Sequence, residues 1–164
     1  MRDHKNKHRG FSLIELLIVV AIILIIAAIA IPNLLRSKMA ANEASAVASL
    51  RTYTTAIVSY QTTYGTDPST DMSQLGPSTT PSSANADLVD NLLGSASPIK
   101  SGYTFTYTAG TAASNGSIST YSLTAQPQTY NTTGQRYFFT DQSGVIRQTT
   151  NGTAATSTDT PIGN

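Results

Sequence analysis

Residues 10–31 read GFSLIELLIVVAIILIIAAIAI, and this stretch decides the fold. From Phe11 to Ile31 every side chain is apolar except those of Ser12 and Glu15. A helix of this length spans about 31 Å, which matches the hydrocarbon core of a bilayer at about 30 Å. A charged side chain at membrane depth costs about 2.5 to 3.5 kcal/mol on insertion scales, so it is seldom kept without a partner or a task. The stretch therefore predicts a membrane helix with a functional carboxylate near its start.

The segment before this helix is short and basic. Met1–Gly10 carries four basic residues and one acidic residue, and it ends in a glycine. A basic stub, the Gly10-Phe11 junction, the glutamate at position 15 and a long apolar helix together resemble the class III signal of type IV pilins and type II secretion pseudopilins. A plain membrane anchor would leave the junction and the glutamate unexplained. An ordinary secretory signal cut near Ala28-Ile29-Ala30 would need a shorter apolar run without a glutamate.

The resemblance implies roles for particular residues. In this family a prepilin peptidase cuts after the glycine, which places the cleavage between Gly10 and Phe11, and the new amine of Phe11 is then N-methylated. The family's glutamate, here Glu15, implies a subunit-assembly contact with the free ammonium of a neighbouring subunit, because an unpaired buried charge is costly. Pro32 is predicted to kink the helix, and its partial melting during assembly is implied by the resemblance alone.

Downstream of Pro32 the apolar residues repeat at helical spacing. This periodicity predicts an amphipathic helix over residues 32–64 that continues the apolar one. Gly65 is expected to cap the helix, and Asp67-Pro68 prevents its continuation. The predicted apolar face comprises Leu35, Met39, Ala46, Leu50, Tyr53, Ile57, Tyr60 and Tyr64.

The remainder of the chain predicts a small sheet. Residues 65–102 form a loop rich in Pro and Ser, with a short helix expected at 86–93. Alternating apolar and polar residues between 103 and 149 predict about four antiparallel strands, with a tight turn at Asp141–Gly144 between the last two, at 136–140 and 144–149. Residues 150–164 have little apolar content and are expected to be loose. The predicted class is α+β, one long N-terminal helix on an antiparallel sheet, which resembles the type IV pilin fold.

Composition argues against several function classes. The chain has no cysteine, and both histidines, His4 and His8, lie in the basic stub, so the usual groups of acid–base and nucleophilic catalysis are missing beyond it. We therefore expect no enzyme activity and no cofactor. Asp141 is the only acid near the last turn, whereas calcium takes six to eight oxygen ligands, so no metal site is expected. Without residues 1–10 the chain has six basic and eight acidic residues, which gives no support for nucleic-acid binding.

The sequence thus predicts a prepilin, a structural subunit cleaved after Gly10 and polymerised through its helix into an extracellular type IV pilus. The expected partners are further copies of the chain, a prepilin peptidase/N-methyltransferase, an inner-membrane assembly platform and, before assembly, membrane lipid. The precursor should cross the bacterial inner membrane once with residues 1–10 in the cytoplasm.

Two alternatives stay open. The first is a major pseudopilin of a type II secretion system, with a periplasmic filament; the lack of calcium-type acids favours the pilus over it. The second is a membrane-anchored β-rich binding domain that never polymerises. That domain would keep an uncut N-terminus and tolerate replacement of Glu15.

Overall fold

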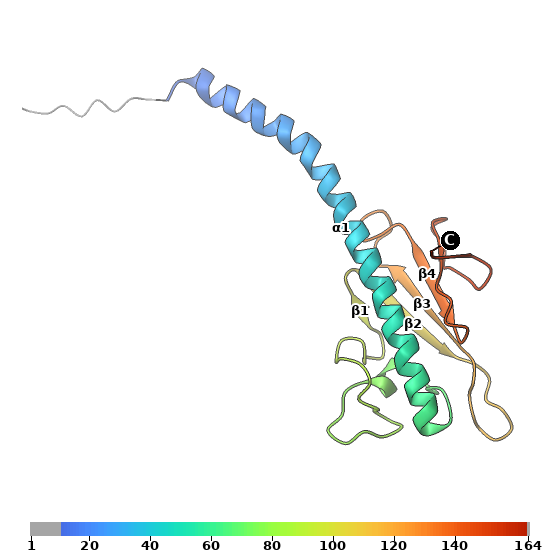
Figure 1. Ribbon diagram of the computed structural model, residues 1–164. Coiled ribbons are helices and arrows are strands. Elements are labelled where there is room, and N and C mark those ends of the chain that lie inside the picture. The colour runs from blue at the N-terminus through green and yellow to red at the C-terminus, as the bar shows by residue number, and fades with distance from the viewer. Residues whose placement is uncertain (1–10, 164) are drawn as a thin grey trace, which may run out of the picture. The chain divides into compact units, whose positions relative to one another are not determined.

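The computed structural model describes residues 11–163 and consists of one long helix followed by a six-stranded sheet (Figure 1). The chain divides into an N-terminal unit, up to Ser37, and a C-terminal unit, from Lys38 onward. The predicted leader, residues 1–10, lies outside the described residues. The elements are α1 (Leu13–Tyr64), the 3₁₀ helix η1 (Met72–Leu75), β1 (Ile99–Lys100), β2 (Tyr103–Ala109), β3 (Tyr121–Pro127), β4 (Tyr137–Asp141), β5 (Arg147–Thr149) and β6 (Thr160–Pro161).

Within the C-terminal unit, α1 buries the apolar stripe that its periodicity predicts. Its fully buried large side chains include Leu50, Tyr53, Ile57 and Tyr60. Leu35, which was expected on the same stripe, is instead half exposed and belongs to the N-terminal unit. The core stripe therefore begins only after the apolar half of the helix has ended.

The helix stops where the glycine signal places its end. Gly65 adopts a φ of +75°, a left-handed backbone conformation that residues other than glycine rarely take. Its N–H donates to the carbonyl of Gln61 at 2.8 Å. The chain then turns away from the helix axis into the long connection that leads to the sheet.

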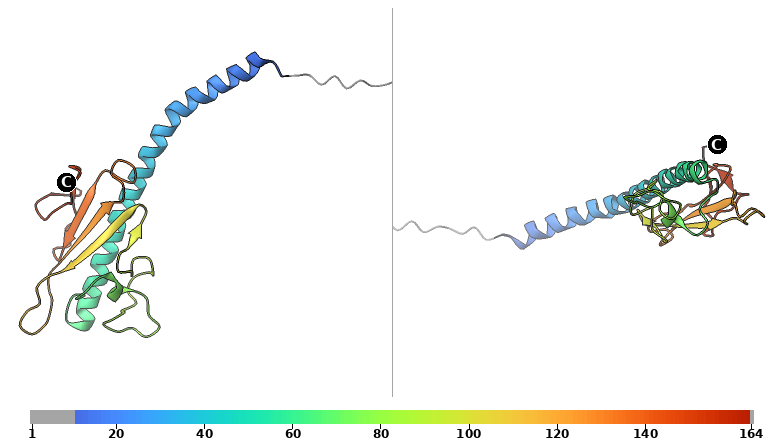
Figure 2. Two further views of the ribbon diagram at one scale, coloured as in Figure 1. Left: turned by 180° about the vertical axis from the view of Figure 1, so that it is seen from behind. Right: turned by 90° about the horizontal axis from the view of Figure 1, so that it is seen from below.

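The six strands form an antiparallel meander in the order β1-β2-β3-β4-β5-β6. In the longest pairing, β2 and β3 run in register from Tyr103 opposite Pro127 to Ala109 opposite Tyr121. Alternate residues point toward α1, as the strand pattern predicts, and residues 38–64 of α1 lie across that one face of the sheet (Figure 1, and from behind in Figure 2). The sheet contributes six side chains to the core: Tyr103, Phe105, Tyr121, Leu123, Ala125 and Phe138. This confirms the α+β class and the helix-on-sheet architecture.

The expected number of about four strands is too low. The two additional strands, β1 and β6, have two residues each, too few to display an alternation. The C-terminal tail is correspondingly more ordered than its composition suggests. β6 pairs with β5, and the N–H of Ile162 donates to the carbonyl of Ile146 at 2.9 Å.

The prediction of a short helix at residues 86–93 is wrong. Asp87 has a φ of +54°, which interrupts any right-handed helix there, and the N–H groups of Leu88 and Val89 both donate to the carbonyl of Leu75. Ala86, Val89 and Leu93 are buried in the core without forming a helix, whereas Leu92 is half exposed. The helical turn lies earlier, at η1, where the Asp71 side chain accepts from the N–H of Ser73 at 2.8 Å.

Candidate functional site

The start of α1 holds the carboxylate that the sequence singles out. Glu15 Oε2 accepts a hydrogen bond from the backbone N–H of Ser12 at 2.9 Å, while the carbonyl of Ser12 accepts from the N–H of Leu16 at 3.2 Å. This is one half of a capping box, in which a glutamate three residues into the helix reaches back to the N-cap. The Ser-x-x-Glu pattern at residues 12–15 is the sequence signal of such a cap.

The residues around this cap are open to the surroundings. The Phe11 side chain is 78% exposed, and Gly10, the other half of the predicted cleavage junction, lies outside the described residues. Within the described chain the carboxylate of Glu15 has a neutral N–H donor as its partner and no basic side chain within 4.0 Å. A backbone N–H does not neutralise a full charge, so the carboxylate keeps its capacity for an ionic partner.

The N-terminal unit presents an apolar surface with nothing packed on it. Its large apolar side chains from Leu13 to Ile31 are between 45% and 79% exposed. Among the described residues, α1 is the helix long and apolar enough to cross a membrane, by length and composition. Patches of this size on soluble proteins mark interaction or membrane surfaces. The segment therefore requires lipid or other apolar helices around it.

Pro32 lies inside α1, and the helix continues through it. Because proline has no N–H, the carbonyl of Ala28 loses the hydrogen bond that position 32 would otherwise donate. The position is thus a local weak point in the backbone ladder. The kink expected there stays a prediction.

In the C-terminal unit an ion pair joins α1 to the start of β4. Glu43 Oε1 accepts from the N–H groups of Gln135 at 2.8 Å and Arg136 at 3.2 Å, and Glu43 Oε2 accepts from Arg136 Nε at 2.7 Å. The Glu43 side chain is only 10% exposed. Arg136 also donates to Gln148 on β5 and lies over the ring of Phe138, 5.4 Å from its centre. We call this set of contacts the Glu43 clasp.

Neighbouring contacts hold the same loop against the helix. Asn42 Nδ2 donates to the carbonyl of Thr133 at 2.9 Å, and the Tyr103 hydroxyl donates to the carbonyl of Arg136 at 2.8 Å. Gly134 lies so close that a Cβ there would be 2.0 Å from the Tyr103 hydroxyl. In a chain without cysteine, the clasp thus links the helix to the C-terminal strands through polar contacts. Sequence reasoning missed it, since a lone glutamate in a helix gives no signal of a partner 93 residues away.

A second buried acid lies just beyond the end of α1. Asp67 is buried, and its Oδ2 has no hydrogen-bond partner within the described part of the chain. Burial raises the pKa of this carboxyl because the charged form loses its hydration. Its backbone N–H donates to the carbonyl of Ile118 at 2.8 Å, and the Tyr107 hydroxyl donates to the carbonyl of Pro68 at the same distance. The junction between helix and sheet therefore contains a carboxyl whose charged form is disfavoured by burial.

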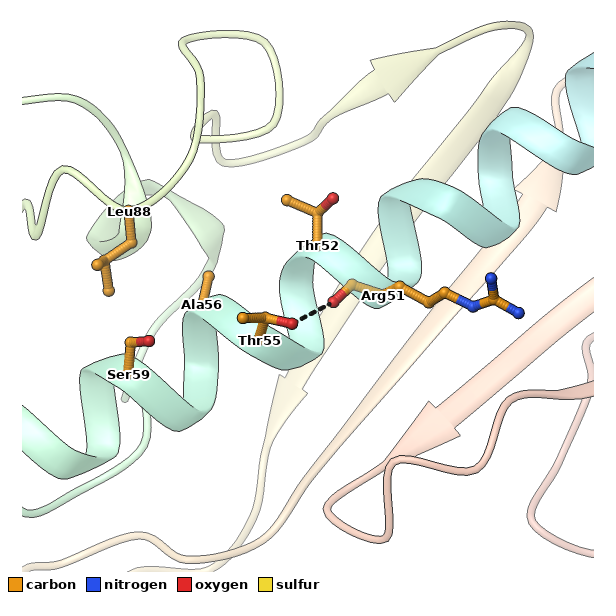
Figure 3. A pocket seen from close by; sticks show the side chains of 6 residues that line it. All are labelled: Arg51, Thr52, Thr55, Ala56, Ser59 and Leu88. Carbon is orange, nitrogen blue, oxygen red and sulfur yellow. Dashed lines mark hydrogen bonds between the residues drawn. The ribbon is translucent and has the colours of Figure 1, made fainter.

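A shallow groove of about 390 Å³ runs along the exposed side of α1 (Figure 3). In Figure 3 the Arg51 side chain extends along the helix away from Leu88. The hydroxyl of Thr55 donates to the Arg51 carbonyl at 3.0 Å, so it is already engaged by the helix backbone. The groove holds no acid, histidine or cysteine that could act in catalysis. Its lining residues are Arg51, Thr52, Thr55, Ala56, Ser59 and Leu88. Over residues 11–163, no group of three or more acidic or histidine side chains could hold a metal ion.

Comparisons with known proteins bear on the first part of the chain. Residues 5–31 match the prokaryotic N-terminal methylation motif. The type IV wide pilus major component PilA4 of Thermus thermophilus is 63% identical over 35 residues, which are 21% of this chain and 27% of that protein. The chain thus aligns with about a quarter of the length of this curated relative. No solved structure matches the chain.

Proposed function

We propose that this chain is the precursor of a structural subunit of an extracellular type IV pilus. The proposal starts from the N-terminal segment, which makes the chain a member of the type IV pilin and pseudopilin family. The observation that carries the proposal is the exposed apolar surface of Leu13–Ile31 with one carboxylate at its start. A fully apolar helix is suited first to lipid and then to packing against copies of itself. The relative's identity as a major pilus component favours the pilus over the pseudopilus.

In the proposed pathway, cleavage after Gly10 makes Phe11 the first residue. A glycine before the cut lets a peptidase approach the backbone closely, since no side chain stands in the way. Phe11 would then carry a free amine, which a prepilin peptidase/N-methyltransferase methylates. The precursor would lie in the inner membrane with residues 1–10 in the cytoplasm, where positive segments are retained.

Glu15 would guide each incoming subunit. Within the described chain its carboxylate is met by the Ser12 N–H alone, whereas the Phe11 ammonium of a neighbouring subunit would supply a full opposite charge. In surroundings of low dielectric such a pair attracts strongly, and a subunit out of register would leave the charge unpaired at high cost. Pro32 would let the helix adapt while the subunit leaves the membrane.

The test is electron microscopy of sheared surface fractions, combined with N-terminal sequencing and mass determination of the filament protein. We expect long extracellular filaments whose subunit begins at N-methylated Phe11. Short filaments confined to the periplasm would assign the chain to the pseudopilins. An N-terminus that stays uncut would contradict both forms of filament subunit and favour a membrane-anchored domain.

Glu15→Gln separates the charge from the helix cap. The amide oxygen can still accept from Ser12, so the start of the helix is preserved while the charge is lost. We expect membrane insertion and cleavage as in the wild type, with filaments absent. Glu15→Asp, which retains the charge on a shorter side chain, is the matched control and should assemble better than Glu15→Gln. Normal filaments from Glu15→Gln would remove the carboxylate from the assembly mechanism.

A further inference from the structure

We propose that Asn151 is a site of spontaneous chemical modification, at which the side chain reacts with the following peptide nitrogen, loses its amide nitrogen as ammonia and becomes a carboxylate. Glycine follows asparagine at Asn115 and at Asn151. The contacts of these sites differ, and they make Asn151 reactive while they protect Asn115. The inference is independent of the proposed function, because it needs neither cleavage nor a filament.

The reaction requires only water and hydroxide. Hydroxide removes the proton of the Gly152 N–H, and the nitrogen then attacks Cγ of Asn151. A C–N bond forms, the Cγ–Nδ2 bond breaks, and Nδ2 leaves as ammonia with a proton from water, which regenerates the hydroxide. Water opens the resulting cyclic imide at either carbonyl carbon. The products are an aspartate and an isoaspartate, in which the main chain runs through the side chain, and nothing is oxidised or reduced.

The nucleophile at this site is accessible. Asn151, Gly152 and Thr153 are all exposed. Within residues 11–163 the N–H of Gly152 finds no hydrogen-bond acceptor, so its proton is open to hydroxide from the solvent. No atom beyond the chain neighbours of Gly152 lies within 4 Å of the position that a Cβ would take. The loop therefore has room to bring the nitrogen to Cγ, and glycine offers no side chain to hinder it.

The carbonyl that is attacked is polarised by hydrogen bonds. Asn151 Oδ1 accepts from the N–H of Thr153 at 3.0 Å and from the Thr153 hydroxyl at 2.7 Å. When the nitrogen attacks Cγ, negative charge develops on Oδ1, and donors at these distances stabilise it as an oxyanion hole does. The loop thus places a free nucleophile and a stabilised carbonyl oxygen on neighbouring residues.

The corresponding atoms of Asn115 are arranged differently. The N–H of Gly116 donates to the carbonyl of Ala113 at 2.8 Å, so the nitrogen keeps its proton and this bond has to break before any attack. Asn115 Oδ1 accepts from the N–H of Ser117 at 3.0 Å, but the Ser117 hydroxyl donates to the carbonyl of Gly65 at 3.2 Å. Asn115 therefore lacks both the free nucleophile and the hydroxyl donor within the described chain.

The modification would change the loop between β5 and β6. Each modified copy gains a negative charge, and in the isoaspartate form the main chain gains an atom directly after Thr150. The Thr150 carbonyl accepts from the Tyr130 hydroxyl at 3.0 Å, so the main chain lengthens next to a point where the loop is held. In a filament outside the cell the modified fraction would increase with the age of the filament, because the reaction needs no enzyme.

The test is incubation of the full chain, in detergent and in water enriched in heavy oxygen at mildly alkaline pH, followed by trypsin digestion and mass spectrometry. Trypsin separates the sites because it cuts after Arg136 and Arg147. We expect heavy oxygen to enter Asn151 about fivefold faster than Asn115, the effect of a hydrogen bond that must first break. In urea the rates should become similar, because the folded contacts are lost. Equal rates in the folded chain, or a difference that persists in urea, would overturn the proposal.

Substitutions at Thr153 test the part played by its hydroxyl. Thr153→Val keeps the N–H and the shape of the side chain, and it should slow the modification of Asn151 about fivefold while the rate at Asn115 stays unchanged. Thr153→Ser, which retains a hydroxyl, is the matched control and should react as the wild type does. A wild-type rate in Thr153→Val would contradict the stabilisation of Oδ1. None of these measurements uses filaments, so their failure leaves the proposed function intact, and an absence of filaments leaves this site intact.

Discussion

Replacing Glu43 by alanine should destabilise the C-terminal unit more than any other single change of an acidic residue. The substitution leaves the N–H groups of Gln135 and Arg136 without their acceptor and separates the Arg136 guanidinium from its counter-charge. Breaking a buried ion pair costs about 3 to 5 kcal/mol. The Arg136 side chain is 35% exposed, so water can solvate its freed charge and the lower end applies. We expect a loss of about 3 kcal/mol in the free energy of unfolding.

The assay is thermal unfolding of the full chain in detergent, followed by near-ultraviolet circular dichroism. No tyrosine precedes Tyr53 and the chain has no tryptophan, so this signal reports on the C-terminal unit and not on the apolar first half of α1. For a unit of this size the loss corresponds to a fall in Tm of about 10 °C. Glu43→Gln, whose amide oxygen can replace Oε1 as the acceptor for both backbone N–H groups, should lose about half as much.

The control is Ser45→Ala, two residues along the same helix. It removes one exposed hydroxyl contact with Ser101 and should change the Tm by no more than about 2 °C. A Tm for Glu43→Ala within that same margin would refute the reasoning. It would mean that the 129–136 loop is held by the apolar core and the neighbouring hydrogen bonds without help from the carboxylate.

The remaining predictions concern three buried polar sites. Because the folded pKa of Asp67 is raised above its ordinary value of 3.8, the wild type should lose stability as pH rises from about 4 toward neutrality. Asp67→Asn should flatten this part of the Tm–pH profile, and an unchanged slope would contradict the assignment. Gly134→Ala should lower the Tm by several degrees, since the new methyl group would overlap the Tyr103 hydroxyl and displace its hydrogen bond. Tyr53→Phe leaves the carbonyl of Leu93 without its donor and should cost about 1 kcal/mol in thermal unfolding.

Much of the architecture is written in local sequence patterns. The apolar run and the helical spacing after it predict α1, and Gly65 predicts its end because a left-handed cap needs only a glycine. Alternation predicts β2 and β3, the two longest strands. The short strands β1 and β6 escape such prediction because two residues carry no period. The false helix at 86–93 shows the converse, since the core buries Val89 and Leu93 while the N–H groups of Leu88 and Val89 donate to the distant carbonyl of Leu75.

The candidate site divides in the same way. The sequence by itself determined the membrane-length helix, the Gly10-Phe11 junction and the isolated Glu15, because each depends on residues that are neighbours in the chain. Only the tertiary structure decided the partner of Glu43 and the burial of Asp67. The physical reason is that the electrostatic free energy of a charged side chain depends on the groups that surround it. For these residues the surroundings are built by segments that meet only when the helix packs on the sheet.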